Sequence, residues 1–284
     1  MPGFSMHTSF VGAGLTYPSH SIESVLRSRI DDLAGPRLQH AGPVEVTRLP
    51  GMARILVISD GTRVAARIRN RHYDRLPDLA IVGPSSRPVV MRIEGPAPLE
   101  IPLSPLDWSR LTSVVAAMTA DRIVRARDLG ITCLNGLADT TRGDIAATAI
   151  ARLADAVVTR DAALADGSAA PLIVQLMALI DEGGVYDAAT AAERLATTSH
   201  NLRRIALRWF GFPPKTLLMR RRFIAALERF QETEMDFAAI ASFGYFDASH
   251  FLRDANRFLG TTPRRYLRRI AGSADSDTQA HPRR

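Results

Sequence analysis

A block of basic residues in the last third of the chain has the clearest chemistry of any feature in this sequence. Between residues 194 and 227 eight side chains are basic and none is acidic: Arg194, Arg203, Arg204, Arg208, Lys215, Arg220, Arg221 and Arg222. Guanidinium groups bind phosphates and the edges of guanine bases. The block therefore indicates an anionic partner, with nucleic acid the first candidate. A solvated basic helix face in an arginine-rich protein is the alternative.

Residues that catalyse reactions or hold metals lack the spacing that such chemistry needs. The first half of the chain contains only scattered histidines and no H-x-H pair: His7, His20, His40 and His72. A metal-dependent cupin, the enzyme alternative for this half of the chain, would need several His and carboxylate ligands close together. Cys133 is the single cysteine, which excludes an intramolecular disulfide and a multi-cysteine zinc site. No phosphate-binding glycine loop, G-x-S-x-G or H-E-x-x-H is present. We therefore expect neither an enzyme nor a metal or other cofactor.

Length and charge place the basic block in a second domain. The chain has 284 residues, 46% of them hydrophobic, which is enough for two globular domains. Of the net charge of +7, residues 1–170 contribute +2 and residues 171–272 contribute +5. The N-terminus lacks a secretory signal pattern, and the longest apolar run, Leu172–Ile180, is interrupted by Gln175. We therefore expect a cytoplasmic protein with no membrane segment.

Strand patterns dominate residues 43–103, and helical patterns follow them. A helix is expected at Ile22–Leu33, and the strands are expected at Val44–Leu49, Arg54–Ser59, Thr62–Arg69, Leu79–Val82, Val89–Glu94 and Leu99–Leu103. Short strands separated by turn residues favour an antiparallel sandwich or barrel. Apolar spacing then predicts helices over Leu106–Ala120 and Thr141–Leu164. The residues from Asp166 to Pro171 form a plausible linker, and the polar tail from Gly272 to Arg284 is expected to be disordered.

Two similar helical units lie beyond this linker. In the first, a short helix at Asp187–Ala196 precedes a helix at His200–Phe210, which Thr198 or Ser199 caps. The apolar stripe of the later helix is formed by Leu202, Ile205, Ala206 and Trp209. Its opposite face carries His200, Arg203, Arg204 and Arg208. The unit therefore has an apolar back and a basic front.

The second unit repeats this arrangement after a long helix at Pro214–Phe230. A short helix at Phe237–Phe243 leads to a turn at Gly244, and Asp247 caps a helix at Ala248–Leu259. The inward side chains are Phe251, Ala255, Phe258 and Leu259, and the outward ones are Ser249, Arg253, Asn256 and Arg257. Two short helices joined by a tight turn form a helix-turn-helix, whose second helix enters the major groove of DNA.

The motifs of this region resemble the DNA-binding domain of the AraC/XylS family. The resemblance rests on two stretches, Gly244-Tyr245-Phe246-Asp247-Ala248-Ser249-His250-Phe251 with Arg253, and Gly260-Thr261-Thr262-Pro263 with Tyr266. It covers about residues 171–271, and it implies seven helices with two reading helices that enter successive major-groove segments. More loosely, the first half is similar to the cupin-like sensory domains attached to this family, on fragments such as Arg48-Leu49-Pro50-Gly51 and Ile81-Val82-Gly83-Pro84.

The resemblance also assigns residues to DNA. It implies that His200, Arg203 and Arg204 meet base edges in the first unit, and that Ala248, Ser249 and Arg253, with His250 nearby, do so in the second. Arg208 and Arg257, on the outward faces of the two helices, are also expected to bind DNA. Arg220, Arg221 and Arg222 are expected to contact phosphates or to remain solvated rather than to read bases. The sequence departs from the family at Ala196, where a turn glycine is common, and at Ala206 and Ala255, where core residues are bulkier.

The fold class expected from these observations is α+β, with a β-rich, cupin-like domain at 1–166, an all-α double helix-turn-helix domain at 171–271 and a tail at 272–284. The expected function is a sequence-specific transcription regulator of the activator type that binds double-stranded DNA. RNA polymerase, a small-molecule effector and a second copy of the chain are further expected partners. The alternative is a protein-interaction or anti-activator module with a degraded helix-turn-helix, which the three alanines favour.

Overall fold

The computed structural model describes residues 43–137, 145–161 and 169–268. The predicted helix at Ile22–Leu33, the first half of the predicted linker (residues 166–168) and the tail at 272–284 lie outside these ranges. No helix within them is long and apolar enough to cross a membrane.

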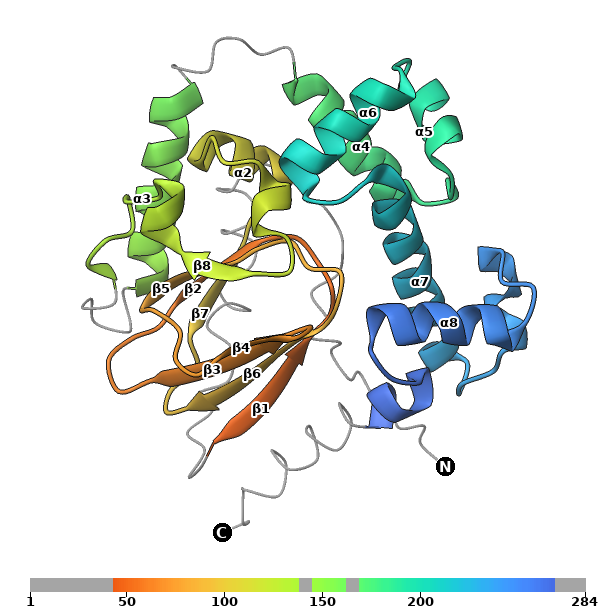
Figure 1. Ribbon diagram of the computed structural model, residues 1–284, viewed down its shortest axis with the longest axis horizontal. Helices are drawn as coiled ribbons and strands as arrows, with labels where there is room; N and C mark the ends of the chain where they lie inside the picture. Colours follow the sequence, from red (N-terminus) through yellow and green to blue (C-terminus); the bar gives the residue numbers. More distant parts are fainter. Residues whose placement is uncertain (1–42, 138–144, 162–168, 269–284) are drawn as a thin grey trace, which may run out of the picture.

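The β-rich part consists of two four-stranded antiparallel sheets (Figure 1). The first has the strand order β1-β6-β3-β4 and the second β7-β2-β5-β8. The strands are β1 (Val44–Arg48), β2 (Arg54–Val57), β3 (Arg63–Ile68), β4 (Arg71–Tyr73), β5 (Leu79–Val82), β6 (Val89–Glu94), β7 (Leu99–Pro102) and β8 (Ile123–Arg125). All six predicted strands are present, within one or two residues of the predicted ends. The two unpredicted strands, β4 and β8, have three residues each, which is too short to show an alternating pattern.

The sheets face each other across an apolar layer, and the second sheet is also covered on its outer face. Leu56 of β2 and Val82 of β5 pack with Val64 of β3 and Met91 of β6 between the sheets. The neighbouring residues Ile55 and Val57 point the other way, into a second apolar cluster that includes residues of the helices. Because β2 and β5 are buried on both faces, their sequences are almost continuously apolar.

Helices cover the outer face of the second sheet (Figure 1). These helices are α2 (Pro105–Leu111), α3 (Ile145–Asp161) and α4 (Ala170–Glu182). Helix α2 contacts both of the others. The predicted helix over Leu106–Ala120 is wrong beyond Leu111, because Thr112 is extended there and its hydroxyl donates to the carbonyl of Leu129. The chain continues through short 3-10 turns, η1 (Ala116–Thr119) and η2 (Ala126–Leu129), on either side of β8.

The C-terminal part is helical, as predicted. It comprises α5 (Ala188–Arg194), α6 (Ser199–Ile205), the π turn η4 (Ala206–Phe210), α7 (Pro214–Glu232), the 3-10 turn η5 (Ala238–Phe243) and α8 (Ala248–Phe258). The prediction of one regular helix over His200–Phe210 misses the π turn. This turn begins at the small residue Ala206 and brings both Trp209 and Phe210 into the buried core.

Apolar packing joins the β-rich part to the first helix-turn-helix unit. A single cluster runs from the inner strands through Trp108 of α2 to Ile205 of α6 and Leu218 of α7. A separate cluster begins at Phe223 of α7 and contains the apolar side chains of the second unit. Beside the apolar layer between the sheets, the described residues therefore form two further cores that meet within α7. The first of these extends across the predicted boundary at residues 166–171.

Candidate nucleic-acid interface

The turn of the first unit is built by two caps and one unusual backbone conformation. Asp187 accepts hydrogen bonds from the backbone N–H groups of Ala189 and Thr190 at the start of α5. Thr198 accepts one from the N–H of Asn201, 3.1 Å away, at the start of α6. Ala196 lies between the two helices with a φ of 46°. The sequence predicted the cap at Thr198, with Ser199 as the alternative, and an altered turn at Ala196, but it placed Asp187 inside the helix rather than at its cap.

The predicted front and back of α6 and η4 agree with the burial of their side chains. Leu202, Ile205, Ala206 and Trp209 are buried. His200, Arg203, Arg204 and Arg208 are exposed. Arg204 donates to the side-chain oxygen of Asn201 at 2.8 Å, and the Arg208 guanidinium lies 4.7 Å from the centre of the Trp209 ring. The structure therefore brings four donor-bearing side chains to the surface of one helical segment.

The second unit has the same design. Gly244 turns the chain with a φ of 74°, and Asp247 accepts a hydrogen bond from the N–H of His250 at 2.7 Å. Phe251, Ala255 and Phe258 of α8 are buried, and the Phe258 ring stacks on Phe223 of α7 at 5.4 Å. The exposed face carries Ser249, Arg253, Asn256 and Arg257.

His250 lies beside a buried ionic network that the sequence did not reveal. The network links α7 to α8: Arg222 and the hydroxyl of Tyr245 each donate to the same carboxylate oxygen of Asp254, both at 2.9 Å. The side chains of Arg222 and Asp254 are only 10% and 7% exposed. Burial, and then the charge of Asp254, raise the pKa of the Tyr245 hydroxyl far above its ordinary value. Tyr245 therefore stays a neutral donor.

His250 is held by this network rather than lying free in front of it. Its Nε2 is 3.3 Å from the guanidinium of Arg222, and its ring meets the Tyr245 ring edge-on at 4.9 Å. The only sequence signal for the network was an acidic residue, Asp254, on the otherwise apolar back of α8.

Arg220 is inside the molecule, which corrects its expected contact with the DNA backbone. Its side chain is about 1% exposed and donates to the carbonyls of Gly51 and Ser85, each at 3.2 Å. These carbonyls belong to two loops of the β-rich part. Arg221 is half-buried and donates to the carbonyl of Asp181 on α4 at 3.3 Å. Of the three consecutive arginines, Arg220 and Arg222 thus stabilise the packing of α7.

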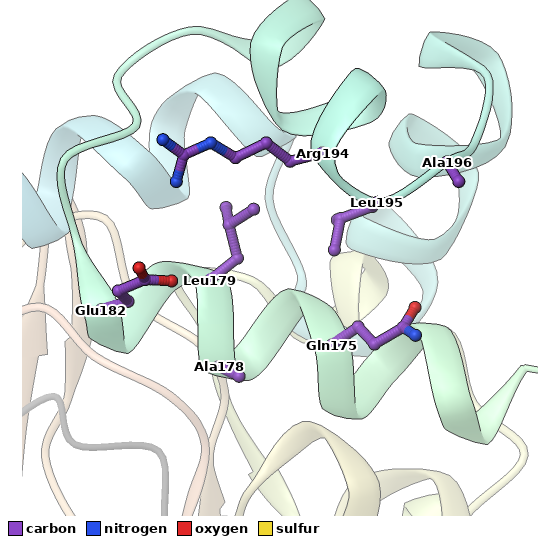
Figure 2. A pocket seen from close by; sticks show the side chains of 7 residues that line it. All are labelled: Gln175, Ala178, Leu179, Glu182, Arg194, Leu195 and Ala196. Atoms are coloured by element: carbon purple, nitrogen blue, oxygen red, sulfur yellow. The ribbon is translucent and has the colours of Figure 1, made fainter.

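A shallow hollow lies between α4 and the turn of the first unit (Figure 2). Gln175, Leu179 and Glu182 of α4 form one wall, and Arg194 and Leu195 form the other. The hollow holds one acid and one base and offers no set of convergent ligands. Among the described residues, no three His, Cys, Asp or Glu side chains lie close enough to hold a metal ion.

Comparison with known proteins identifies this helical region. Residues 191–269 match the family model of a helix-turn-helix domain. These residues form an AraC-type helix-turn-helix domain. The match extends from the middle of α5 to beyond α8, so that it contains both reading helices and the long helix α7 between them. It supports a DNA-binding transcription regulator. No curated protein matches this chain.

Proposed function

We propose that this protein is a sequence-specific transcription regulator that inserts α6 and α8 into successive major-groove segments of one DNA duplex. The observation that carries the proposal is the repeated design of the two AraC-type units. In each unit the second helix has a buried apolar back, and its exposed front carries arginines. A helix with such a front fits the major groove, where arginine reads guanine edges.

The length of α7 supports simultaneous docking of both helices. With 19 residues at 1.5 Å each, α7 is about 28 Å long. Figure 1 shows α6 near one end of α7 and α8 near the other. Successive major-groove segments on one face of DNA are about 34 Å apart, so a spacer of this length matches the repeat of the duplex.

The roles of the side chains follow from their places on the two helices. His200, Arg203 and Arg204 in the first unit, and Ser249 and Arg253 in the second, are proposed to meet base edges. Arg208 and Arg257, at the far ends of the two segments, are proposed to bind phosphates, together with Arg221. Phosphate contacts set the register on the duplex, and base contacts distinguish sequences.

Regulation is proposed to act through the β-rich part. The turn η1 of this part packs against η4, directly after the first reading helix. An effector or a second copy of the chain that moved η1 would therefore alter how α6 meets DNA, or how the protein contacts RNA polymerase. Such control needs a measured coupling between two sites. We further propose that the protein is cytoplasmic, as binding to chromosomal DNA requires, and acts without catalysis.

The competing proposal is a protein-interaction module whose units no longer read DNA. The positive φ of Ala196 and the small buried residues Ala206 and Ala255 support it, because they depart from the family's usual turn and core. The two proposals differ in the salt dependence of DNA binding. A regulator with six or more phosphate contacts should lose on the order of 1,000-fold in affinity between about 50 and 200 mM salt.

Substitutions of single arginines test base reading directly. The cognate duplex is the sequence that the wild-type protein enriches from a random-sequence library. Arg203→Ala should weaken binding to it by about 1–3 kcal/mol and relax selectivity at one position, because a bidentate guanine contact is lost. Arg257→Ala should weaken binding to all sequences alike, because a phosphate carries no sequence information. Titrations of each variant with cognate and scrambled duplexes measure both effects. Equal losses on both duplexes for Arg203→Ala would refute base reading, and an absence of DNA binding by the wild type would favour the interaction module.

A further inference from the structure

An aromatic side chain stands in solvent directly before the second reading helix. Phe246 is 96% exposed, more than Met118 at 69% or Val174 at 37%, the other large apolar side chains left in water among the described residues. It precedes Asp247, the cap of α8, and lies in the turn that starts at Gly244. A ring held in water at this position needs an explanation other than folding.

The turn holds Phe246 outward through its neighbour. Tyr245 is buried, its hydroxyl donates to Asp254, and its ring packs against Phe251 at 5.2 Å. An apolar residue directly before a helix cap often packs on the fourth residue of the helix, which here is Phe251. Tyr245 already fills that place. Phe246 is therefore excluded from the core, and the anchored residues on either side of it restrict its backbone.

The surroundings of Phe246 indicate what it meets. It lies at the N-terminal end of α8, the end from which a reading helix reaches base edges. The exposed side chains that follow on this helix include Ser249, Arg253 and Arg257, with both charged ones basic. An apolar group among basic side chains is poorly suited to an apolar protein surface but well suited to a duplex. The major groove offers one apolar feature, the 5-methyl group of thymine, which phenylalanine contacts.

We propose that Phe246 is a specificity-determining residue that packs against a thymine methyl group in the major-groove segment entered by α8. This inference rests on the proposed function and adds a base preference to it. The second unit then reads DNA through an apolar contact as well as through Ser249 and Arg253. Because the ring is already exposed and its backbone anchored, the contact requires little rearrangement of the protein.

The test uses the full chain and a duplex enriched by the wild-type protein from a random-sequence library. Each thymine of the α8 segment is replaced in turn by deoxyuridine, which lacks only the methyl group. At one position this replacement should lower the affinity of the wild type about fourfold, the value of one buried methyl group. The same replacement should leave the affinity of Phe246→Ala unchanged. Val174→Ala is the control, because it shortens an exposed apolar side chain on α4, away from α8. This variant should lose affinity on the deoxyuridine replacement as the wild type does.

Each result separates this inference from the proposed function. Enrichment of no duplex by the wild type would overturn both. If a duplex is enriched but no thymine-to-deoxyuridine replacement changes the affinity in a way that Phe246→Ala abolishes, the inference alone is overturned. If Phe246→Ala lowers transcription in a purified system with RNA polymerase while its DNA affinity and deoxyuridine response match those of the wild type, the ring contacts the polymerase and the inference is wrong. Thermal unfolding of Phe246→Ala should match the wild type, because the ring packs on nothing in the fold.

Discussion

Ala196 adopts a backbone conformation that costs free energy for any residue with a Cβ atom. Its φ of 46° lies in the left-handed region, which disfavours L-residues by roughly 1–2 kcal/mol and suits glycine. Ala196→Gly should therefore raise the free energy of unfolding by about 0.5–1 kcal/mol, after the entropy of the more flexible unfolded chain is subtracted. Urea denaturation of the two proteins measures the difference.

A second alanine provides the matched control for this substitution. Ala178 is exposed in the middle of α4, where Ala178→Gly should lower the free energy of unfolding by about 0.5–1 kcal/mol. If Ala196→Gly also lowers it, the turn is not strained. A higher free energy of unfolding for Ala196→Gly would show that alanine in place of the usual turn glycine destabilises the first unit but still allows it to fold.

Side chains whose partners are near in sequence were predictable, and side chains whose partners are distant were not. Thr198 and Asp247 cap helices through N–H groups three residues away, so type and spacing sufficed to predict them. Arg220 binds loop carbonyls 169 and 135 residues earlier in the chain, and Arg222 pairs with Asp254. From sequence alone, a run of arginines on a helix indicates a solvated face. Only the folded structure shows the distant partners that bury Arg220 and Arg222.

At the scale of elements, one half-buried carboxylate connects strands of the two sheets. Glu100 of β7 accepts hydrogen bonds from Arg48 of β1, at 2.8 Å, and from Arg54 of β2, at 3.3 Å. Burial alone would raise the pKa of Glu100, but the two guanidinium groups outweigh burial and hold it below its ordinary value of 4.5. The carboxylate therefore stabilises the fold in its charged form, and the stabilisation is complete above the pKa of the unfolded chain.

The pH dependence of unfolding follows from this depressed pKa. As the pH falls below the ordinary pKa of 4.5 and through the lower pKa of the folded protein, protonation of Glu100 should remove its stabilising contribution. Glu100→Gln should be less stable than the wild type at neutral pH and should lose less stability over this interval. Denaturant titrations at several pH values measure the two slopes. Glu234→Gln, which removes the same charge from an exposed position, should keep the wild-type slope; equal slopes for Glu100→Gln and the wild type would contradict the assignment.

Regular elements followed from local pattern, and their ends followed from tertiary contacts. The alternation in β3 and β6 and the apolar stripes of α6 and α8 were visible in the sequence because each element buries one face. The end of α2 depends on a hydrogen bond from Thr112 to Leu129, 17 residues away, and the π turn η4 places Ala206, Trp209 and Phe210 in a core shared with the β-rich part. Neither cause leaves a periodic signal in the sequence.

For the whole molecule, the shared core means that the β-rich part and the first helix-turn-helix unit are packed as one body. Trp108 of α2 and Trp209 of η4 belong to the same buried cluster. Gly211, directly after η4, lies so close to Pro84 that an added Cβ atom would be 2.8 Å from the proline ring. Composition predicted two parts with a linker, but it carries no information on how tightly the parts pack. The regulation proposed above would therefore act through direct packing contacts between the β-rich part and the segment that contains α6.

Arg220 is the polar link between these parts, and its removal should destabilise the whole protein. Arg220→Ala deletes two hydrogen bonds to the loops at Gly51 and Ser85 and leaves a cavity, so the free energy of unfolding should fall by about 2–5 kcal/mol. Arg229→Ala, an exposed arginine on the same helix, should change it by less than about 0.5 kcal/mol. Tryptophan fluorescence and circular dichroism should give coincident unfolding curves for both variants, because the tryptophans lie in the core that spans both parts. If the free energy of unfolding of Arg220→Ala equals that of Arg229→Ala, the buried contacts of Arg220 do not couple the β-rich part to the helices.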